Sequence, residues 1–236
     1  MRIAVERIER SCPEADIYNQ LLALDNKHIL ELGCGSAAIT RDIASAGADR
    51  KITALEVDEI AHAKNLQVAD LPNVTFGLAG AEDIPLDDAT VDVVLMFKSL
   101  HHVPLERMDA ALREINRVLK PGGLAYISEP IFAGAFNDIL RLFHDESEVR
   151  EAAFNALQTA VAEGLFELAD EVFFNAPSRF ESFADFEDRI LKVTHTRHQL
   201  SDAVYALVKR RFEAHLGDDG AEFFMPIRVD LLRRPG

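Results

Sequence analysis

The stretch that decides the fold is Ile29-Leu30-Glu31-Leu32-Gly33-Cys34-Gly35-Ser36-Ala37-Ala38-Ile39-Thr40. The apolar run of residues 28–32 predicts a buried parallel strand, which ends at Gly33. A helical pattern follows, and we expect Ser36 to be its N-cap. A strand, a glycine turn and a helix form a ligand crevice at the carboxyl edge of an α/β sheet. The glycines allow a ligand to lie against bare backbone.

The acid inside this stretch bears on which ligand the crevice takes. Gly33, Gly35 and Ala38 fit the loose pattern of dinucleotide sites. Glu31, however, lies two residues before the first glycine, where a carboxylate repels a pyrophosphate. S-adenosylmethionine carries a sulfonium and an ammonium instead of phosphates, so it tolerates that acid. The alternative interpretation is an ordinary acid at a strand end.

A second acid follows at the end of the next predicted strand, residues 52–58. Glu56 is our first choice and Asp58 our second for a residue that accepts hydrogen bonds from both ribose hydroxyls. The spacing from the glycines suits both NAD and S-adenosylmethionine, and it does not separate the two cofactors.

Three further stretches, residues 80–86, 91–103 and 117–124, complete a set of four motifs. In this order they resemble the class I S-adenosylmethionine-dependent methyltransferases, in the broad group with small or unassigned substrates. The resemblance covers roughly residues 20–130. It implies an α/β fold with a Rossmann-like, mostly parallel seven-stranded sheet, helices on both faces and an antiparallel last strand.

The resemblance also implies a cofactor site. Its residues are Glu31, Gly33, Cys34, Gly35, Ser36, Glu56, Val57, Ala81, Glu82, Phe97 and Lys98. The family often has an acid, which binds the adenine amino group, at the position of Gly80 here. We expect the backbone of Ala81 and the side chain of Glu82 or Asp83 to replace it. Cys34 fills the turn as a small residue, with a steric role.

Catalysis needs in-line alignment of the acceptor atom, the methyl carbon and the sulfur. The sulfonium is already activated, so we expect no metal. His101 and Lys98, after the predicted strand of residues 91–97, are the candidate catalytic residues, with His102 beside them. The alternatives are a structural imidazole for His101 and a side chain that reaches solvent for Lys98.

Composition limits the partners. The chain has 236 residues and a net charge of −15, which disfavours nucleic acid. The basic run of residues 209–211 lies on a predicted amphipathic helix and suits a solvated face. No apolar run is long enough for a membrane span, and no secretory signal is visible. With two cysteines, Cys12 and Cys34, no disulfide framework is expected. We therefore expect a cytoplasmic enzyme with no membrane partner.

The second half of the chain predicts additions to a single domain of residues 1–236. Helices at 136–143 and 149–160 form a predicted helical cap insertion, residues 134–161, over the acceptor pocket; plain packing on the sheet is the alternative. A sixth strand follows at 166–176. Additional helices are expected within 178–216, at 183–193 and 202–216, and the last strand at 222–232. We interpret His195, Arg197 and His198 as a solvated helix end rather than a metal site.

The function that these observations favour is methyl transfer from S-adenosylmethionine to a small-molecule acceptor. Apolar side chains of the cap predict the walls of its pocket, namely Phe132, Phe136, Ile139, Leu140 and Phe143. An NAD-dependent oxidoreductase and a non-catalytic cofactor-binding protein are the alternatives. The acceptor, the atom methylated and the oligomeric state are left open.

Overall fold

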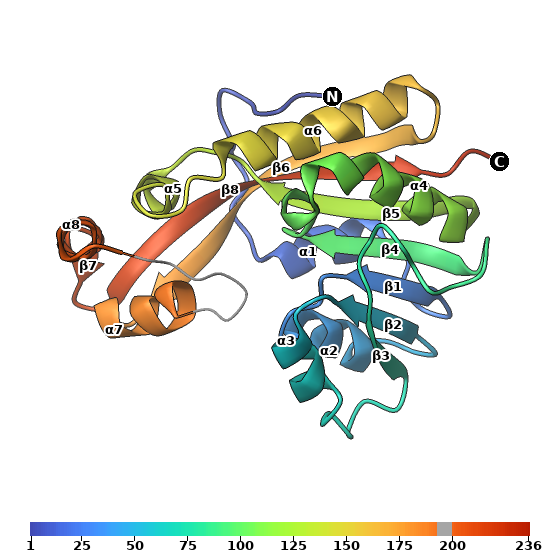
Figure 1. Ribbon diagram of the computed structural model, residues 1–236, viewed down its shortest axis with the longest axis horizontal. Coiled ribbons are helices and arrows are strands. Elements are labelled where there is room, and N and C mark those ends of the chain that lie inside the picture. The colour runs from blue at the N-terminus through green and yellow to red at the C-terminus, as the bar shows by residue number, and fades with distance from the viewer. Residues whose placement is uncertain (193–199) are drawn as a thin grey trace.

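A computed structural model describes residues 1–192 and 200–236 (Figure 1). Its central sheet has the strand order β3-β2-β1-β4-β5-β8-β6. The strands are β1 His28–Leu32, β2 Lys51–Glu56, β3 Val74–Leu78, β4 Val91–Phe97, β5 Leu119–Pro130, β6 Glu167–Phe180 and β8 Gly220–Arg233. Strand β8 is antiparallel to β5 and β6, and the two-residue strand β7, Leu216–Gly217, pairs with it. The predicted mostly parallel sheet with an antiparallel last strand is confirmed.

Most of the helices connect successive strands along the chain. They are α1 Glu14–Leu21, α2 Ala38–Ser45, α3 Glu59–Asn65, α4 Met108–Val118, α5 Ala135–Leu140, α6 Ser147–Ala162, α7 Phe183–Phe186 and α8 Asp202–Glu213. Short 3₁₀ turns, η1 Leu100–His102 and η2 Leu105–Arg107, follow β4, and a π-helical turn, η3 Glu187–Leu191, extends α7. The Ser201 hydroxyl accepts a hydrogen bond from the Val204 N–H and so caps α8.

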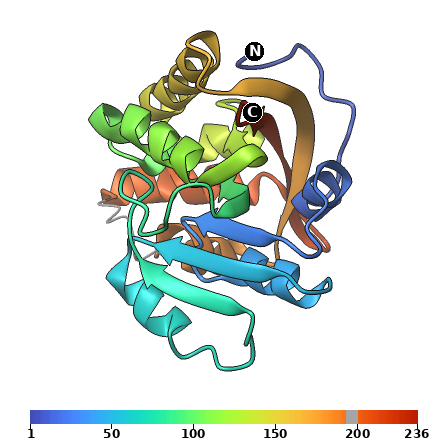
Figure 2. The ribbon, with the colours of Figure 1, turned by 90° about the vertical axis from the view of Figure 1, so that its right-hand side faces the viewer.

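Side chains of β1 alternate between two cores, one on each face of the sheet. Leu30 and Leu32 pack with α4 and α6, whereas Ile29 packs with α1 and α2. Figures 1 and 2 show helices on both faces. Because both faces are covered, the central strands are apolar along most of their length. This explains why residues 28–32 and 91–97 were recognisable as strands.

A third core lies beyond the carboxyl edge of the sheet. The 14-residue strands β6 and β8 extend past the parallel strands, and α5, α7 and α8 gather around their far ends (Figure 1). We call these three helices and the strand ends the distal unit. Six phenylalanine rings fill it, with the centroids of neighbouring rings 4.9–6.2 Å apart: Phe136, Phe180, Phe183, Phe186, Phe212 and Phe223. Much of the chain's phenylalanine therefore builds this unit.

Several predicted boundaries are wrong. Ser36 is not an N-cap, because Ala37 has φ of 58° and α2 begins only at Ala38, without a side-chain cap. The helix predicted at 202–216 ends at Glu213, since β7 pairs with β8. The strand predicted at 166–176 continues to Phe180.

The run Pro121-Gly122-Gly123 does not separate a helix from a strand. Helix α4 ends before it, at Val118, and β5 already begins at Leu119. The run lies within β5, where the pairing with β4 slips between Val91 and Val93. The helix predicted at 183–193 is a short α-helix plus a π turn, and its last residue lies outside the described ones. Residues 1–26 contain one helix, α1.

The two helices predicted within 134–161 are present as α5 and α6. Ala153 and Leu157 of α6 are fully buried in the core beside α4, whereas Phe136 and Ile139 of α5 belong to the distal core. Helix α6 therefore packs on the sheet layer, and the acceptor-covering role of 134–161 stays a prediction. Among the described residues, no helix is long and apolar enough to cross a membrane.

Candidate functional site

The turn after β1 alternates its backbone conformation. Gly33, Gly35 and Ala37 all have positive φ, at 73°, 53° and 58°. The N–H groups of Gly33 and Cys34 donate to the Leu55 carbonyl, which ties the turn to β2. The two glycines differ in their surroundings. A Cβ at Gly33 would lie 2.8 Å from Ser99 Cβ, whereas one at Gly35 would meet no atom within 4 Å. Of these two glycines, only Gly35 leaves room for an added Cβ.

Glu56 holds this turn from the end of β2. One carboxylate oxygen accepts from the Gly35 N–H at 2.6 Å. The other accepts from the N–H groups of Val57 and Asp58 at 2.8 and 2.9 Å. Three of the roughly four lone-pair sites of the carboxylate are thus occupied, and the remaining one is on the oxygen that binds Gly35. Asp58, the second choice for this role, instead caps α3 by accepting from Ile60 and Ala61.

Glu31 lies beneath the turn rather than on its surface. Its side chain is buried and accepts a 2.7 Å hydrogen bond from the Thr40 hydroxyl of α2. Burial raises the pKa of this carboxyl to about 7, against the lowering effect of Thr40. Its predicted contact with a ligand stays a prediction.

The remaining turn residues have structural partners. Asn65 of α3 donates to the Gly35 carbonyl at 2.9 Å and lies 3.5 Å from Cys34 Sγ. Burial raises the pKa of the Cys34 thiol to about 12, so the thiolate needed of a nucleophile is disfavoured. This agrees with the steric interpretation of Cys34. Ser36 is exposed beside it.

The loop after β3 explains the glycine at position 80. A Cβ on Gly80 would lie 2.7 Å from the Glu82 carboxyl carbon, so the Glu82 carboxylate occupies the space of a residue-80 side chain. Arg107 donates to Glu82 at 3.1 Å. Ala81 is buried and Asp83 is exposed. The proposed role of Glu82 as a substitute for the family's acid stays a prediction.

A cavity of about 300 Å³ opens beside the ends of β4 and β5. Lys98 and His101 line it from the sheet side, and Arg189 and Ile190 line it from the distal unit. Phe136, Leu140 and Phe143 are wall residues, as predicted; Phe132 and Ile139 are not. Phe132 lies under the guanidinium groups of Arg141 and Arg150, and Ile139 belongs to the distal core.

Lys98 and Phe97 are fixed by the N-terminal helix. Lys98 has a positive φ of 54°, and its Nζ lies 2.5 Å from a carboxylate oxygen of Glu14 in α1. The Phe97 ring is buried between Tyr18 and Tyr126, with centroids at 5.7 and 5.5 Å. Val57, by contrast, is 66% exposed at the end of β2.

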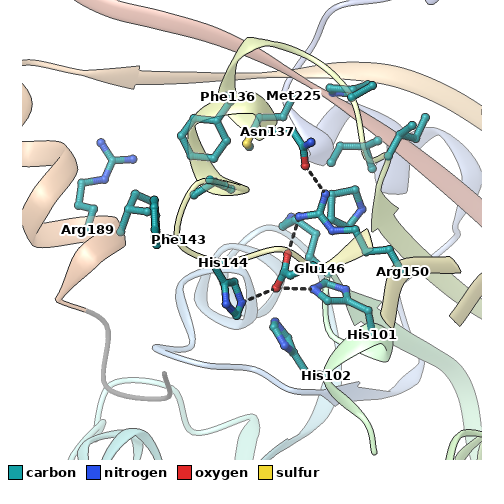
Figure 3. Close-up of a pocket in the computed structure, with 18 residues that line it drawn as sticks. His101, His102, Phe136, Asn137, Phe143, His144, Glu146, Arg150, Arg189 and Met225 are labelled. Carbon is teal, nitrogen blue, oxygen red and sulfur yellow. Dashed lines mark hydrogen bonds and ion pairs between the residues drawn. The ribbon is translucent and has the colours of Figure 1, made fainter. Parts of the chain in front are cut away.

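Two carboxylates flank the buried ring of His101, and Figure 3 shows one of them, that of Glu146. His101 Nδ1 lies 2.5 Å from Glu129 and His101 Nε2 lies 3.6 Å from Glu146. Burial alone would lower the pKa of His101, but the two carboxylates raise it to about 9. Burial likewise opposes ionisation of Glu146, yet His101 and Arg150 together hold its pKa well below its usual range.

Sequence reasoning missed Glu129, Glu146 and Arg150. Glu129 stands inside the apolar fifth strand, which was the one available signal, since a charge there must be paired. Glu146 directly precedes α6, and Arg150 lies in that helix. Nothing in their spacing connects them with residue 101. His195, Arg197 and His198 lie outside the described residues.

The buried Glu31 generates a prediction on stability. A carboxyl whose pKa is about 7 in the folded state and 4.5 otherwise binds its proton more tightly when folded. The free energy of unfolding therefore falls as pH rises from about 4.5 to about 7, by roughly 3 kcal/mol, and stays low above that. Glu31→Gln keeps an acceptor for Thr40 and should remove this decline.

Urea unfolding at pH 5 and pH 7.5 would measure the effect in both proteins, with Asp83→Asn as an exposed control. Parallel pH profiles for the wild type and Glu31→Gln would contradict the assignment of a buried, protonated carboxyl.

Known proteins match this chain over the residues that form the site. Residues 30–127 match a family model described as a methyltransferase domain. An uncharacterised methyltransferase of Mycobacterium tuberculosis is 37% identical over 122 residues, covering 51% of this chain and 47% of the relative. An O-methyltransferase of Aspergillus nomiae is 32% identical over 155 residues, covering 63% and 65%. The chain thus spans about half the length of the first of these relatives.

The fold is also similar to that of solved structures. The crystal structure of the YcgJ protein of Bacillus subtilis superposes with a TM-score of 0.64 at 16% identity, over 94% of this chain and 97% of that one. At this identity the likeness concerns the fold alone. The matched residues contain the glycine turn, Glu56, the Glu82 loop and His101. Residues 30–127 of this chain are therefore similar to a methyltransferase domain.

Proposed function

We propose that the chain binds S-adenosylmethionine in the crevice between the glycine turn and Glu56, and transfers its methyl group to a small molecule. The observation that carries this is the open space at Gly35, directly beside the Glu56 carboxylate. A ligand with vicinal hydroxyls fits acceptor oxygens at this position, because Glu56 is a hydrogen-bond acceptor only. A pyrophosphate fits poorly beside the Glu56 carboxylate, which would repel it.

Further residues complete the proposed cofactor site. The backbone of Gly33, Cys34, Gly35 and Ser36 borders the crevice after β1, and the buried Glu31 lies beneath it. The exposed Val57 offers an apolar surface for the adenine ring, with Ala81 and Glu82 on the opposite loop. Phe97 and Lys98 close the site toward β4. When bound, the cofactor supplies an activated methyl group.

The cavity next to Lys98 and His101 is the proposed acceptor pocket. Its phenylalanine, leucine and isoleucine walls favour an acceptor with an apolar body, and its volume suits a small molecule rather than a polymer. The chain's task is then to align the acceptor and exclude water. His101 and Lys98 stay the proposed catalytic residues, because both line the pocket directly after β4.

The match to a methyltransferase domain disfavours the oxidoreductase alternative. It leaves a non-catalytic cofactor-binding protein as the competing function. Methyl turnover, measured as described below, separates these two functions.

Gly35 provides the first test of the cofactor crevice. Gly35→Ala should weaken S-adenosylhomocysteine binding at least ~10-fold, because its methyl group enters ligand space. Gly122→Ala is a matched control: Gly122 also has positive φ, at 76°, and open space around a Cβ, but it lies in β5 away from the crevice. Both variants carry a backbone strain of about 1 kcal/mol.

Calorimetric titration of both variants gives the comparison, with circular dichroism to confirm folding. Equal affinities for Gly35→Ala and Gly122→Ala would contradict the crevice assignment.

Glu82 provides a test of the adenine end. Glu82→Ala should weaken S-adenosylhomocysteine binding by roughly 10-fold, since a hydrogen bond to a charged group contributes about 1.5–3 kcal/mol. Adding Gly80→Asp to that variant should restore most of the affinity, because the space above residue 80 is then free. Gly80→Asp alone should weaken binding, as its side chain meets the Glu82 carboxylate.

Asp83→Ala is the control, since Asp83 is the exposed alternative. Calorimetry on the four variants decides the matter. If Asp83→Ala is the damaging change and Glu82→Ala is not, the assignment of Glu82 is wrong.

The acceptor pocket is tested by filling it. Met225 of β8 lines the cavity, whereas its neighbour Phe224 is 48% exposed. Met225→Trp should bind S-adenosylhomocysteine like the wild type but lose at least ~10-fold in methyl transfer, because the indole takes acceptor volume. Phe224→Trp should change neither.

Transfer is measured with methyl-labelled S-adenosylmethionine and a cell extract divided into small molecules, RNA and protein. We expect label in the small-molecule fraction. Label in RNA or protein, or equal transfer by both variants, would refute the small-molecule pocket. A deletion of residues 134–161 is a poorer test, because Leu157 belongs to the main core.

A further inference from the structure

Three imidazoles gather around one carboxylate at the wall of the cavity (Figure 3). Ligand atoms of His101, His102 and Glu146 lie within 4.8 Å of one another, the sole such set among the residues the structure describes. The Nε2 atom of His144 lies 2.9 Å from Glu146 Oε1. All four residues line the same cavity. Three of these residues thus have donor atoms close together at the cavity wall, and His144 adjoins that set through Glu146.

Neighbouring residues fix the two buried members of this cluster. Glu129 binds His101 Nδ1 at 2.5 Å, and its second oxygen accepts from the Leu100 N–H at 2.9 Å. His101 Nε2 is therefore turned toward Glu146. Arg150 binds Glu146 Oε2 at 2.6 Å and leaves Oε1 on the side of the imidazoles. A carboxylate on the far nitrogen of an imidazole is the usual support of a metal-binding histidine.

We propose that His101, His102, His144 and Glu146 bind a divalent transition-metal ion of the zinc type. Imidazole donors suit zinc, cobalt and nickel, whereas magnesium and calcium require oxygen ligands. The donor atoms must draw closer to reach bonds of about 2.0–2.2 Å. His102 is exposed and the His144 side chain is 35% exposed, so side-chain rotation at these two positions closes the site. His101 and Glu146 are already held in place.

Charge in the surroundings is compatible with a cation. Glu129 and Glu146 are two buried acids, and Arg150 supplies one buried positive charge against them. A divalent ion that takes the place of the His101 proton brings positive charge to a position that both carboxylates already favour. The cavity gives the ion an entry path and an open coordination position.

The cluster revises the expectation that the site holds no metal. Methyl transfer from a sulfonium needs none, so any ion there would instead hold an oxygen of the acceptor, with His101 acting as its ligand. The sequence does not indicate this cluster. Residues 101 and 102 lie in η1, whereas residues 144 and 146 lie far along the chain, between α5 and α6. The site proposal does not depend on the proposed function.

Zinc binding by the full chain is the test. After dialysis against a chelator, calorimetric titration with zinc chloride should show one equivalent bound, and cobalt chloride should give the visible absorption of a tetrahedral site. His102→Ala and His144→Ala should each weaken zinc binding by roughly 10-fold or more. His215→Ala is the control, since His215 lies on the distal unit against Phe223.

Glu129→Gln tests the support of His101, and circular dichroism shows whether it folds. Zinc affinity that is unchanged in both histidine variants, or no zinc binding at all, would overturn the proposal. S-adenosylhomocysteine affinity, measured in the same variants, should equal that of the wild type. That second measurement separates a failed metal site from a failed cofactor crevice.

Discussion

The carboxylate of Glu56 accepts three backbone N–H groups, from Gly35, Val57 and Asp58. This arrangement joins the turn after β1 to the turn after β2 and fixes both at the carboxyl edge of the sheet. Without it, the N–H groups of two tight turns would lack a shared acceptor. The crevice, the start of α2 and the position of α3 all follow from this one set of hydrogen bonds. Asn65 reinforces it from α3.

A second constraint is the length of β6 and β8. These strands carry the distal unit past the parallel strands, so that Arg189 and Ile190 stand opposite Lys98 and His101 across the cavity. The aromatic core of the unit is separate from the two cores of the sheet. Under the proposed function, acceptor selection and cofactor binding then belong to different parts of the chain. This agrees with a family match that ends at residue 127, before the distal unit begins.

Much of this was predictable from the sequence, for physical reasons. Strands buried on both faces are continuous apolar runs, which made β1, β2 and β4 recognisable, and the acid at the end of β2 followed from spacing. The start of α2 was not predictable, because a residue such as Ala37 gives no sign of a positive φ. The sequence left two acids, Glu82 and Asp83, as candidates for the space beside Gly80, and only the structure shows that Glu82 occupies it.

The carboxylates around His101 were hidden for a different reason. Glu129 and Glu146 reach the ring from β5 and the start of α6, and only tertiary packing brings those elements together. The pocket walls were anticipated in part: α5 supplies Phe136 and Leu140, but the far wall comes from η3 and β8. Long-range contacts of this kind leave no periodic signal in the chain.

The central claim is that the crevice at Gly35 and Glu56 selects S-adenosylmethionine over a dinucleotide. The most direct measurement is a calorimetric titration of the wild-type chain with S-adenosylhomocysteine and, separately, with NADH. We expect one equivalent of S-adenosylhomocysteine to bind and NADH to show no saturable heat. Saturable binding of NADH, or its displacement of S-adenosylhomocysteine, would contradict the account.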